Sequence, residues 1–313
     1  DMVAQEDVVI TISKAGYIKR LPVSTYRTQQ RGGQGVTGLT TRLEDITQQM
    51  FIASTHSYIL CFSNLGRCYW LKVFSIPQGG RTSKGKAIVN LLGLKSGEYI
   101  TELVPVKNFQ GDFFIFFATR KGVINKLALK DFANVRRDGI NAIKLDSGDD
   151  LIDACFCFGQ GYVMLGTRQG MAVRFDVTSL RQQGRNTRGV KGITLSKGDE
   201  VAKMILVKED SDVLCVTENG YGKRTFVKEY RLTKRGGKGV INIKCSERNG
   251  KVVSLLPVKE NDGVMIMTTE GTIIRIAAGK ISRIGRNTQG VRLINLKENH
   301  KVKDVTKVVE TPN

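Results

Sequence analysis

The chain consists of six similar segments, and each segment carries two glycines at nearly fixed places. The first glycine recurs every 48 to 56 residues, and Ser or Thr always stands three positions before it. These first glycines are Gly16, Gly66, Gly122, Gly170, Gly220 and Gly271. A second glycine follows 17 or 19 residues later, at Gly35, Gly85, Gly139, Gly189, Gly239 and Gly290. Such self-similarity indicates a repeat architecture in which neighbouring units bury each other's faces.

Each repeat has the pattern of a small antiparallel sheet. Short apolar runs rich in β-branched and aromatic residues precede the first glycine, as at 113–117 and 213–216. Runs of this length between turn residues favour strands over helices. Glycine supplies the positive φ of a tight hairpin turn, and Asn219-Gly220 is the strongest such signal. We therefore expect a strand, a tight turn, a strand, a loop that ends at the second glycine, and a further strand.

A repeat of this length supplies roughly four strands, the size of one propeller blade. We predict an all-β fold, a six-bladed propeller-like array of four-stranded blades, or β-pinwheel. The whole chain, 1–313, is expected to form a single domain. The predicted blades are roughly 1–48, 49–100, 101–150, 151–200, 201–251 and 252–313.

Composition narrows the class further. The chain has 313 residues, 41% of them hydrophobic, and its six cysteines lie mostly inside apolar runs. We expect buried free thiols in a reducing cytoplasm, and neither a metal site nor a cofactor. No apolar run is long enough to cross a membrane, and the acidic start lacks a signal region. The absence of an initiating Met suggests a piece of a longer polypeptide.

The net charge indicates a polyanionic partner. Lys and Arg total 49 against 29 Asp and Glu, which gives +20 at pH 7 and a pI near 9.8. The cations recur with the repeat, because five of six repeats place one four residues after the first glycine; the second has Trp70 there. The loop before the second glycine is basic in every repeat. We therefore predict positive belts around a disc, in which the DNA-binding rim comprises Arg20, Arg27, Arg81, Lys84, Lys126, Arg136, Arg137, Arg174, Arg185, Arg188, Arg224, Lys234, Arg235, Lys238, Arg275 and Arg286.

Belts of charge suit duplex DNA wrapped along the rim without reading of its sequence. The alternative for any single cation is a solvated strand end, but solvation does not require the sign to recur in each repeat. Single-stranded nucleic acid is a weaker fit, since aromatic residues make up only 7% of the chain and do not alternate with the cations.

One loop resembles a known motif. Residues 26–35 read Tyr-Arg-Thr-Gln-Gln-Arg-Gly-Gly-Gln-Gly, which resembles the Gln-Arg-Arg-Gly-Gly-Lys-Gly box of the C-terminal domain of the gyrase A family. The stretch 9–22 is similar to the opening strands of that family, and the resemblance extends over all six repeats. The predicted DNA-binding box is Gln29, Gln30, Arg31, Gly32, Gly33, Gln34 and Gly35. Gln30 replaces the usual Arg and Gln34 the usual Lys, so the charge of the box is reduced.

The resemblance implies a β-pinwheel whose adjacent blades exchange strands and which wraps double-stranded DNA for negative supercoiling. It also implies a parent ATP-dependent type II topoisomerase, DNA gyrase, localised in the cytoplasm with the nucleoid. In that family strand cleavage belongs to the preceding N-terminal part of the same polypeptide, whereas ATP hydrolysis belongs to the partner subunit. The chain itself is not expected to be an enzyme, because it has two histidines far apart and no Walker or Rossmann fingerprint.

Two alternatives stay open at this point. The related subunit of topoisomerase IV carries a similar pinwheel, usually with a degraded box, and the two substitutions in this box agree with that interpretation. A protein-interaction propeller is the other alternative, but it predicts a face that is apolar or of mixed charge.

Overall fold

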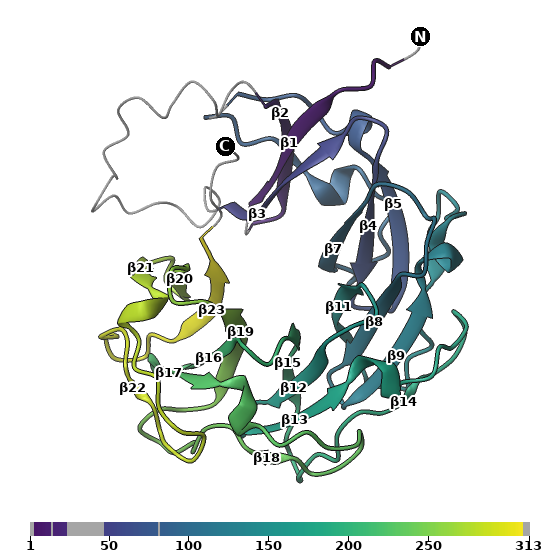
Figure 1. Ribbon diagram of the computed structural model, residues 1–313. Coiled ribbons are helices and arrows are strands. Elements are labelled where there is room, and N and C mark those ends of the chain that lie inside the picture. The colour runs from purple at the N-terminus through teal and green to yellow at the C-terminus, as the bar shows by residue number, and fades with distance from the viewer. Residues whose placement is uncertain (1–2, 14, 24–46, 81, 309–313) are drawn as a thin grey trace.

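The computed structural model describes residues 3–13, 15–23, 47–80 and 82–308. Within them the chain forms six antiparallel sheets that follow one another around a common centre (Figure 1). Five sheets have four strands, and the sixth has three among the described residues. This arrangement confirms the predicted all-β, six-bladed fold.

The strands of each sheet are given from the centre outward. Sheet 1 contains β3 (Thr47–Ser54), β1 (Asp7–Ser13), β2 (Tyr17–Pro22) and β6 (Lys86–Ala87). Sheet 2 contains β7 (Ile100–Val106), β4 (Tyr58–Ser63), β5 (Arg67–Lys72) and β10 (Ile140–Asn141). Sheet 3 contains β11 (Leu151–Cys157), β8 (Phe114–Thr119), β9 (Val123–Ala128) and β14 (Val190–Lys191).

The second half of the chain repeats the plan. Sheet 4 contains β15 (Val201–Val207), β12 (Tyr162–Thr167), β13 (Met171–Asp176) and β18 (Val240–Ile241). Sheet 5 contains β19 (Val252–Val258), β16 (Asp212–Thr217), β17 (Tyr221–Phe226) and β22 (Val291–Arg292). Sheet 6 contains β23 (Val302–Lys307), β20 (Gly263–Thr268) and β21 (Ile273–Ala277).

Short 3-10 helices follow the third strand of a blade. They are η2 (Val73–Ser75), η4 (Leu129–Phe132), η5 (Val177–Ser179), η6 (Val227–Glu229) and η7 (Ala278–Lys280), and η3 (Ile88–Asn90) follows β6. After each of η2, η4, η5, η6 and η7 the chain crosses to the preceding blade and adds the short outer strand there. We call the segment between the 3-10 helix and this outer strand the crossover loop.

The outer strand of each complete blade therefore comes from the next repeat. β6, for example, belongs to the second repeat but pairs with β2, with Tyr17 opposite Ala87. The strand exchange that the family resemblance implied is present at all five complete blades. The ranges expected from the glycine spacing thus describe repeats, whereas each sheet draws on two successive repeats.

The core lies between blades, and this explains the continuous apolar runs. Leu214 on β16 packs in a cluster with Val264 of blade 6, whereas its neighbour Val213 packs with Met164 of blade 4. Successive side chains of a strand point to opposite faces, so a strand covered on both faces must be apolar at nearly every position. All six residues of β16 are buried for this reason.

The Ser or Thr of each repeat bonds across the hairpin turn, and in blade 5 the Thr217 hydroxyl does so by donating to the carbonyl of Tyr221 at 3.3 Å. The hydroxyl of Thr167 accepts the backbone N–H of Met171 at 3.0 Å, and Ser13 and Thr119 do the same for Tyr17 and Val123 at 3.1 Å. The turn glycine in between has positive φ at all six sites. A hydroxyl at this spacing satisfies a backbone donor that the turn would otherwise leave unpaired.

The second glycine permits close contact between a crossover loop and the preceding blade. Gly239 has a φ of +80°, and a Cβ added there would overlap the backbone carbonyl oxygen of Ala172. Both the conformation and the space exclude a side chain at this point. This fixes where the crossover loop meets the outer edge of the sheet.

Candidate nucleic-acid interface

Part of the predicted interface lies outside the described residues. The whole predicted box, Gln29 to Gly35, falls there, as do Arg27 and Arg81. The other predicted rim residues are all described.

The cation four residues after the turn glycine joins adjacent blades. The Nε of Arg20 donates to the carbonyl of Ile76 at 2.7 Å, that of Arg174 to Tyr230 at 2.7 Å, and that of Arg224 to Ile281 at 2.8 Å. Each acceptor directly follows the 3-10 helix of the next repeat. The backbone at this position also bonds the crossover loop, as in the pairing of Arg224 with Arg283. The recurring side chain is thus a donor that holds the next repeat in place.

Trp70 supports this interpretation, because it stands where the other repeats have a cation. Its indole N–H donates to the carbonyl of Phe132 in η4 at 2.9 Å. Lys126 completes the series with a contact of 3.4 Å from its Nζ to the carbonyl of Val177. A neutral donor fills the same place in the second repeat, so the contact with the next repeat can be made without a positive charge.

Three of these cations are not on the surface, contrary to the expectation of an exposed belt. Lys126, Arg174 and Arg224 are only 8%, 5% and 6% exposed. The reason is that each side chain is enclosed between its own blade and the next repeat. Arg20 is half-buried, and Arg275 is exposed on β21, which has no outer neighbour among the described strands. Contact of these five residues with DNA stays a prediction. The burial of Lys126, Arg174 and Arg224 makes such contact unfavourable for these three.

A second set of arginines links a crossover loop to the outer strand that the preceding repeat adds. Arg185 donates to the carbonyl of Asn141 at 3.3 Å, Arg235 to Lys191 at 3.1 Å and Arg286 to Ile241 at 2.8 Å. Each donor stands four residues before the second glycine, and each acceptor ends an outer strand. Arg31 and Arg81 occupy the same sequence position. The fixed spacing is visible in the sequence, but the linking role of these arginines is not.

Many exposed cations lie on the crossover loops and outer strands. Among the predicted rim residues these are Lys84, Arg136, Arg137, Arg188, Lys234, Lys238 and the partly bonded Arg235. Arg188 is paired with Asp146. The predicted rim omits exposed cations on or next to the outer strands, namely Lys86, Lys144, Lys191, Lys244 and Arg292. In the sequence these residues stand one to five positions after the second glycine, whereas the prediction considered only the loops before that glycine.

Two arginines meet on one tyrosine at the outer edge of blade 5. The hydroxyl of Tyr221 accepts hydrogen bonds from Arg292 at 2.7 Å and from Arg248 at 3.2 Å. These hydrogen bonds lower the pKa of the Tyr221 phenol because they favour its charged form, and the bond from Arg292 has the largest effect. The two guanidinium groups concentrate positive charge at this place on the rim.

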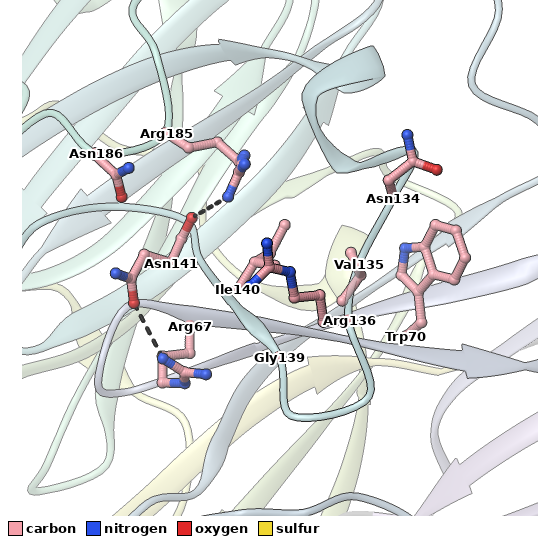
Figure 2. Close-up of a pocket in the computed structure, with 10 residues that line it drawn as sticks. All are labelled: Arg67, Trp70, Asn134, Val135, Arg136, Gly139, Ile140, Asn141, Arg185 and Asn186. Carbon is pink, nitrogen blue, oxygen red and sulfur yellow. Dashed lines mark hydrogen bonds between the residues drawn. The ribbon is translucent and has the colours of Figure 1, made fainter.

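A hollow opens at the rim where blade 2 meets the crossover loops of the third and fourth repeats (Figure 2). Its volume is about 640 Å³. We call it the arginine hollow; Figure 2 shows ten lining residues, among them Arg67, Trp70, Val135, Arg136, Asn141 and Arg185. None of the described residues that line it is acidic.

The described part of the chain offers little for other kinds of site. There, no three His, Cys, Asp or Glu side chains gather in a way that could hold a metal ion. No helix in residues 3–13, 15–23, 47–80 and 82–308 is long and apolar enough to cross a membrane.

Comparison with known proteins defines the class. Six segments of the chain match the family described as DNA gyrase C-terminal domain, beta-propeller: residues 7–54, 57–107, 114–154, 161–208, 211–259 and 264–308. The chain belongs to this family.

Particular relatives agree with this assignment. The DNA gyrase A protein of Escherichia coli (strain K12) is 44% identical over 310 residues, which cover 99% of this chain and 35% of that protein. The DNA gyrase A protein of Staphylococcus aureus (strain MRSA252) is 45% identical over 313 residues, with coverage of 99% and 35%. The chain spans about a third of the length of the curated relatives it matches.

Solved structures show the same fold. The C-terminal domain of DNA topoisomerase IV has a TM-score of 0.85 at 26% identity and covers 98% of this chain and 94% of its own. The DNA gyrase A C-terminal domain has a TM-score of 0.74 at 28% identity, with coverage of 97% and 100%. The fold is thus similar to domains from both DNA gyrase and DNA topoisomerase IV.

Proposed function

We propose that this domain binds duplex DNA without sequence preference and wraps it along the outer rim. The observation that carries the proposal is the ring of exposed cations on crossover loops and outer strands, such as Lys84, Arg137, Lys191, Lys238 and Arg292. They recur in successive blades, so they form a path and not a single pocket. Cations in this arrangement neutralise phosphates and release counterions, which gives affinity without reading bases.

The burial of Lys126, Arg174 and Arg224 changes which residues we assign to this path. We assign DNA contact to the exposed set and a blade-joining role to the buried set. The large net charge of +20 remains available to DNA mainly through the exposed side chains. Membership in the gyrase family supports the same partner.

Wrapping requires many contacts, because duplex DNA is stiff. At about 45° per helical turn, half a circle takes roughly 40 base pairs, and bending a rod of that length costs on the order of 10 kcal/mol. A ring of weak phosphate contacts offsets such a cost only if many act together. This requirement favours an interface spread over several blades.

In its parent protein the domain would serve negative supercoiling. We infer that it works beside the N-terminal cleavage part of a gyrase A polypeptide and beside the ATPase partner subunit, in the cytoplasm with the nucleoid. The domain itself performs no strand cleavage or ATP hydrolysis in this proposal. Its contribution is to present a bent segment of DNA to the cleavage part.

The salt dependence of duplex binding tests the proposal. If about ten phosphates are contacted, log affinity plotted against log salt should have a slope of about −9. The slope is measured by titrating a labelled duplex of about 40 base pairs at several salt concentrations. A slope shallower than about −3 would exclude wrapping, and a duplex of unrelated sequence should give the same slope as the first.

A further inference from the structure

We propose that the arginine hollow is a discrete site for a phosphate group of the DNA backbone, a proposal that rests on the proposed function. Several donors converge there on one open hollow. It holds three guanidinium groups, whereas two meet at Tyr221 in blade 5. The hollow would therefore fix one point of the duplex relative to the protein.

An irregularity of the third repeat accounts for the hollow. The distance from first to second glycine is 17 residues in this repeat and 19 in the five others. Val135 also stands four residues before the second glycine, where Arg185, Arg235 and Arg286 link loops in other repeats. The crossover loop is thus shorter and lacks its linking arginine. Less chain covers the outer edge of blade 2 as a result.

Three guanidinium groups line the space that this leaves. Arg67 comes from β5, Arg136 from the short loop, and Arg185 from the next crossover loop (Figure 2). Arg67 is held by bonds to the carbonyl of Asp138 at 2.6 Å and to the side chain of Asn141 at 3.1 Å. Its position is therefore fixed before any ligand arrives. Three positive charges without a lining carboxylate favour an anion.

One of these arginines retains donors that a ligand can reach. The Nε of Arg67 has no hydrogen-bond partner in the described structure, but it is buried and closed to a ligand. The exposed Arg136 side chain takes part in none of the hydrogen bonds or ion pairs found among the described residues, and Figure 2 draws no bond to it. Guanidinium groups match the geometry of phosphate oxygens, with two parallel N–H donors for each pair of oxygens. A backbone phosphate would supply acceptors for the exposed guanidinium group of Arg136.

The size of the hollow agrees with a segment of backbone. A volume of about 640 Å³ exceeds the space of one phosphate and allows the flanking sugars to enter as well. The hollow lies among crossover loops at the rim, along the proposed DNA path.

Trp70 makes occupancy of the hollow measurable. It is the only tryptophan of the chain, and it is half-buried beside the hollow with its N–H bonded to Phe132. Its ring stacks on Phe109 with 5.7 Å between centroids. An anion bound next to this ring would change its emission. Trp70 also lines an adjoining hollow with Arg136 and Arg137, so the comparison of variants at these two positions is needed to place the anion.

The experiment compares Arg136→Ala with Arg137→Ala in the full chain. Both residues are exposed neighbours and both changes remove one charge, but only Arg136 lines the arginine hollow. Binding of a duplex of about 40 base pairs is measured at fixed salt by anisotropy and by Trp70 emission, and pyrophosphate is titrated separately. We expect an affinity loss of about twofold for Arg137→Ala, typical of an exposed charge, and of about tenfold for Arg136→Ala. The emission change should persist in Arg137→Ala and disappear in Arg136→Ala.

The outcomes separate this inference from the proposed function. If the duplex binds but Trp70 emission does not change, or if both variants lose the same affinity and keep the emission change, the inference is overturned and the wrapping proposal stands. If the duplex does not bind at moderate salt, the wrapping proposal fails. Pyrophosphate that changes emission in the wild type but not in Arg136→Ala would then still support an anion site. No emission change with pyrophosphate either would overturn both.

Discussion

Replacement of Arg224 with alanine tests whether the recurring cation joins blades or binds DNA. Arg224 donates to the carbonyl of Ile281 and to Asp212, with its Nη1 3.0 Å from the Asp212 Oδ2. Asp212 is only 3% exposed and keeps one other basic partner, Arg283. The variant thus loses a buried charge-assisted bond to the next repeat and leaves a buried carboxylate less well paired.

The expected loss of stability is large. Removal of a buried charged donor costs about 1.5–3 kcal/mol for the hydrogen bond, and loss of one partner of a buried ion pair costs about 3–5 kcal/mol. Because Arg283 still pairs with Asp212, we expect a value of about 3 kcal/mol in total. A change of this size should lower the midpoint of thermal unfolding by roughly 6 °C.

Arg275→Ala is the matched control, because Arg275 has the same place in the sixth repeat but is exposed. Its effect on stability should stay within about 0.5 kcal/mol. Both variants are compared by circular dichroism during heating and by duplex affinity at a temperature where both are folded. Equal unfolding midpoints, together with a loss of DNA affinity in Arg224→Ala, would refute the assignment of this residue to blade joining.

Three further predictions address the second glycine, a buried lysine and the box. Gly239→Ala should destabilise the domain by about 1–3 kcal/mol in urea unfolding, since its φ is +80° and its Cβ position is occupied, whereas Gly184→Ala, with open space around it, should change stability by less than about 0.5 kcal/mol. Burial lowers the pKa of Lys223 from 10.5 to about 8. Between pH 8 and 10.5 the unfolded chain therefore binds more protons than the folded one, and the free energy of unfolding should rise with pH relative to that of Lys223→Met. A difference in unfolding free energy between the two proteins that does not change with pH would contradict this. Alanine at residues 31–33 of the box should leave gel-shift binding largely intact but abolish the shortening of an end-labelled duplex, and the parent enzyme should then relax DNA without supercoiling it; equal loss of binding and bending would exclude the box as the clamp.

The repeat signals were sufficient for the fold because they reflect strict backbone requirements. Positive φ at Gly122 and Gly220 and a hydroxyl three residues earlier are needed for each turn, so their spacing determined the number of blades. The exchange of outer strands followed only from the family resemblance. An outer strand such as β6 has two residues, which is too short to leave a pattern in the sequence.

The candidate site could be predicted only in part, because the spacing of residues shows which positions are equivalent in the repeats but not whether a side chain is buried or exposed. The cation after the turn glycine was correctly seen as recurrent, but Arg174 and Arg224 turned out to lie between blades. Trp70 was the sequence signal for this environment, because a neutral donor stands at a position that the other repeats fill with cations. The arginine hollow also had a signal, the short loop of the third repeat, but only the structure brings Arg67 next to it.

The exchange of outer strands has a consequence for the order in which the domain assembles during synthesis. The first blade needs residues up to Ala87, and the second is complete only when Asn141 has been made. The outer edge of each of the five complete blades is therefore paired only after the following repeat has been synthesised. A nascent chain always exposes one unfinished edge, and that edge moves along the molecule one repeat behind the growing end. Truncation behind Lys280 would for the same reason remove β22 and open blade 5, although every other strand of that blade is still present.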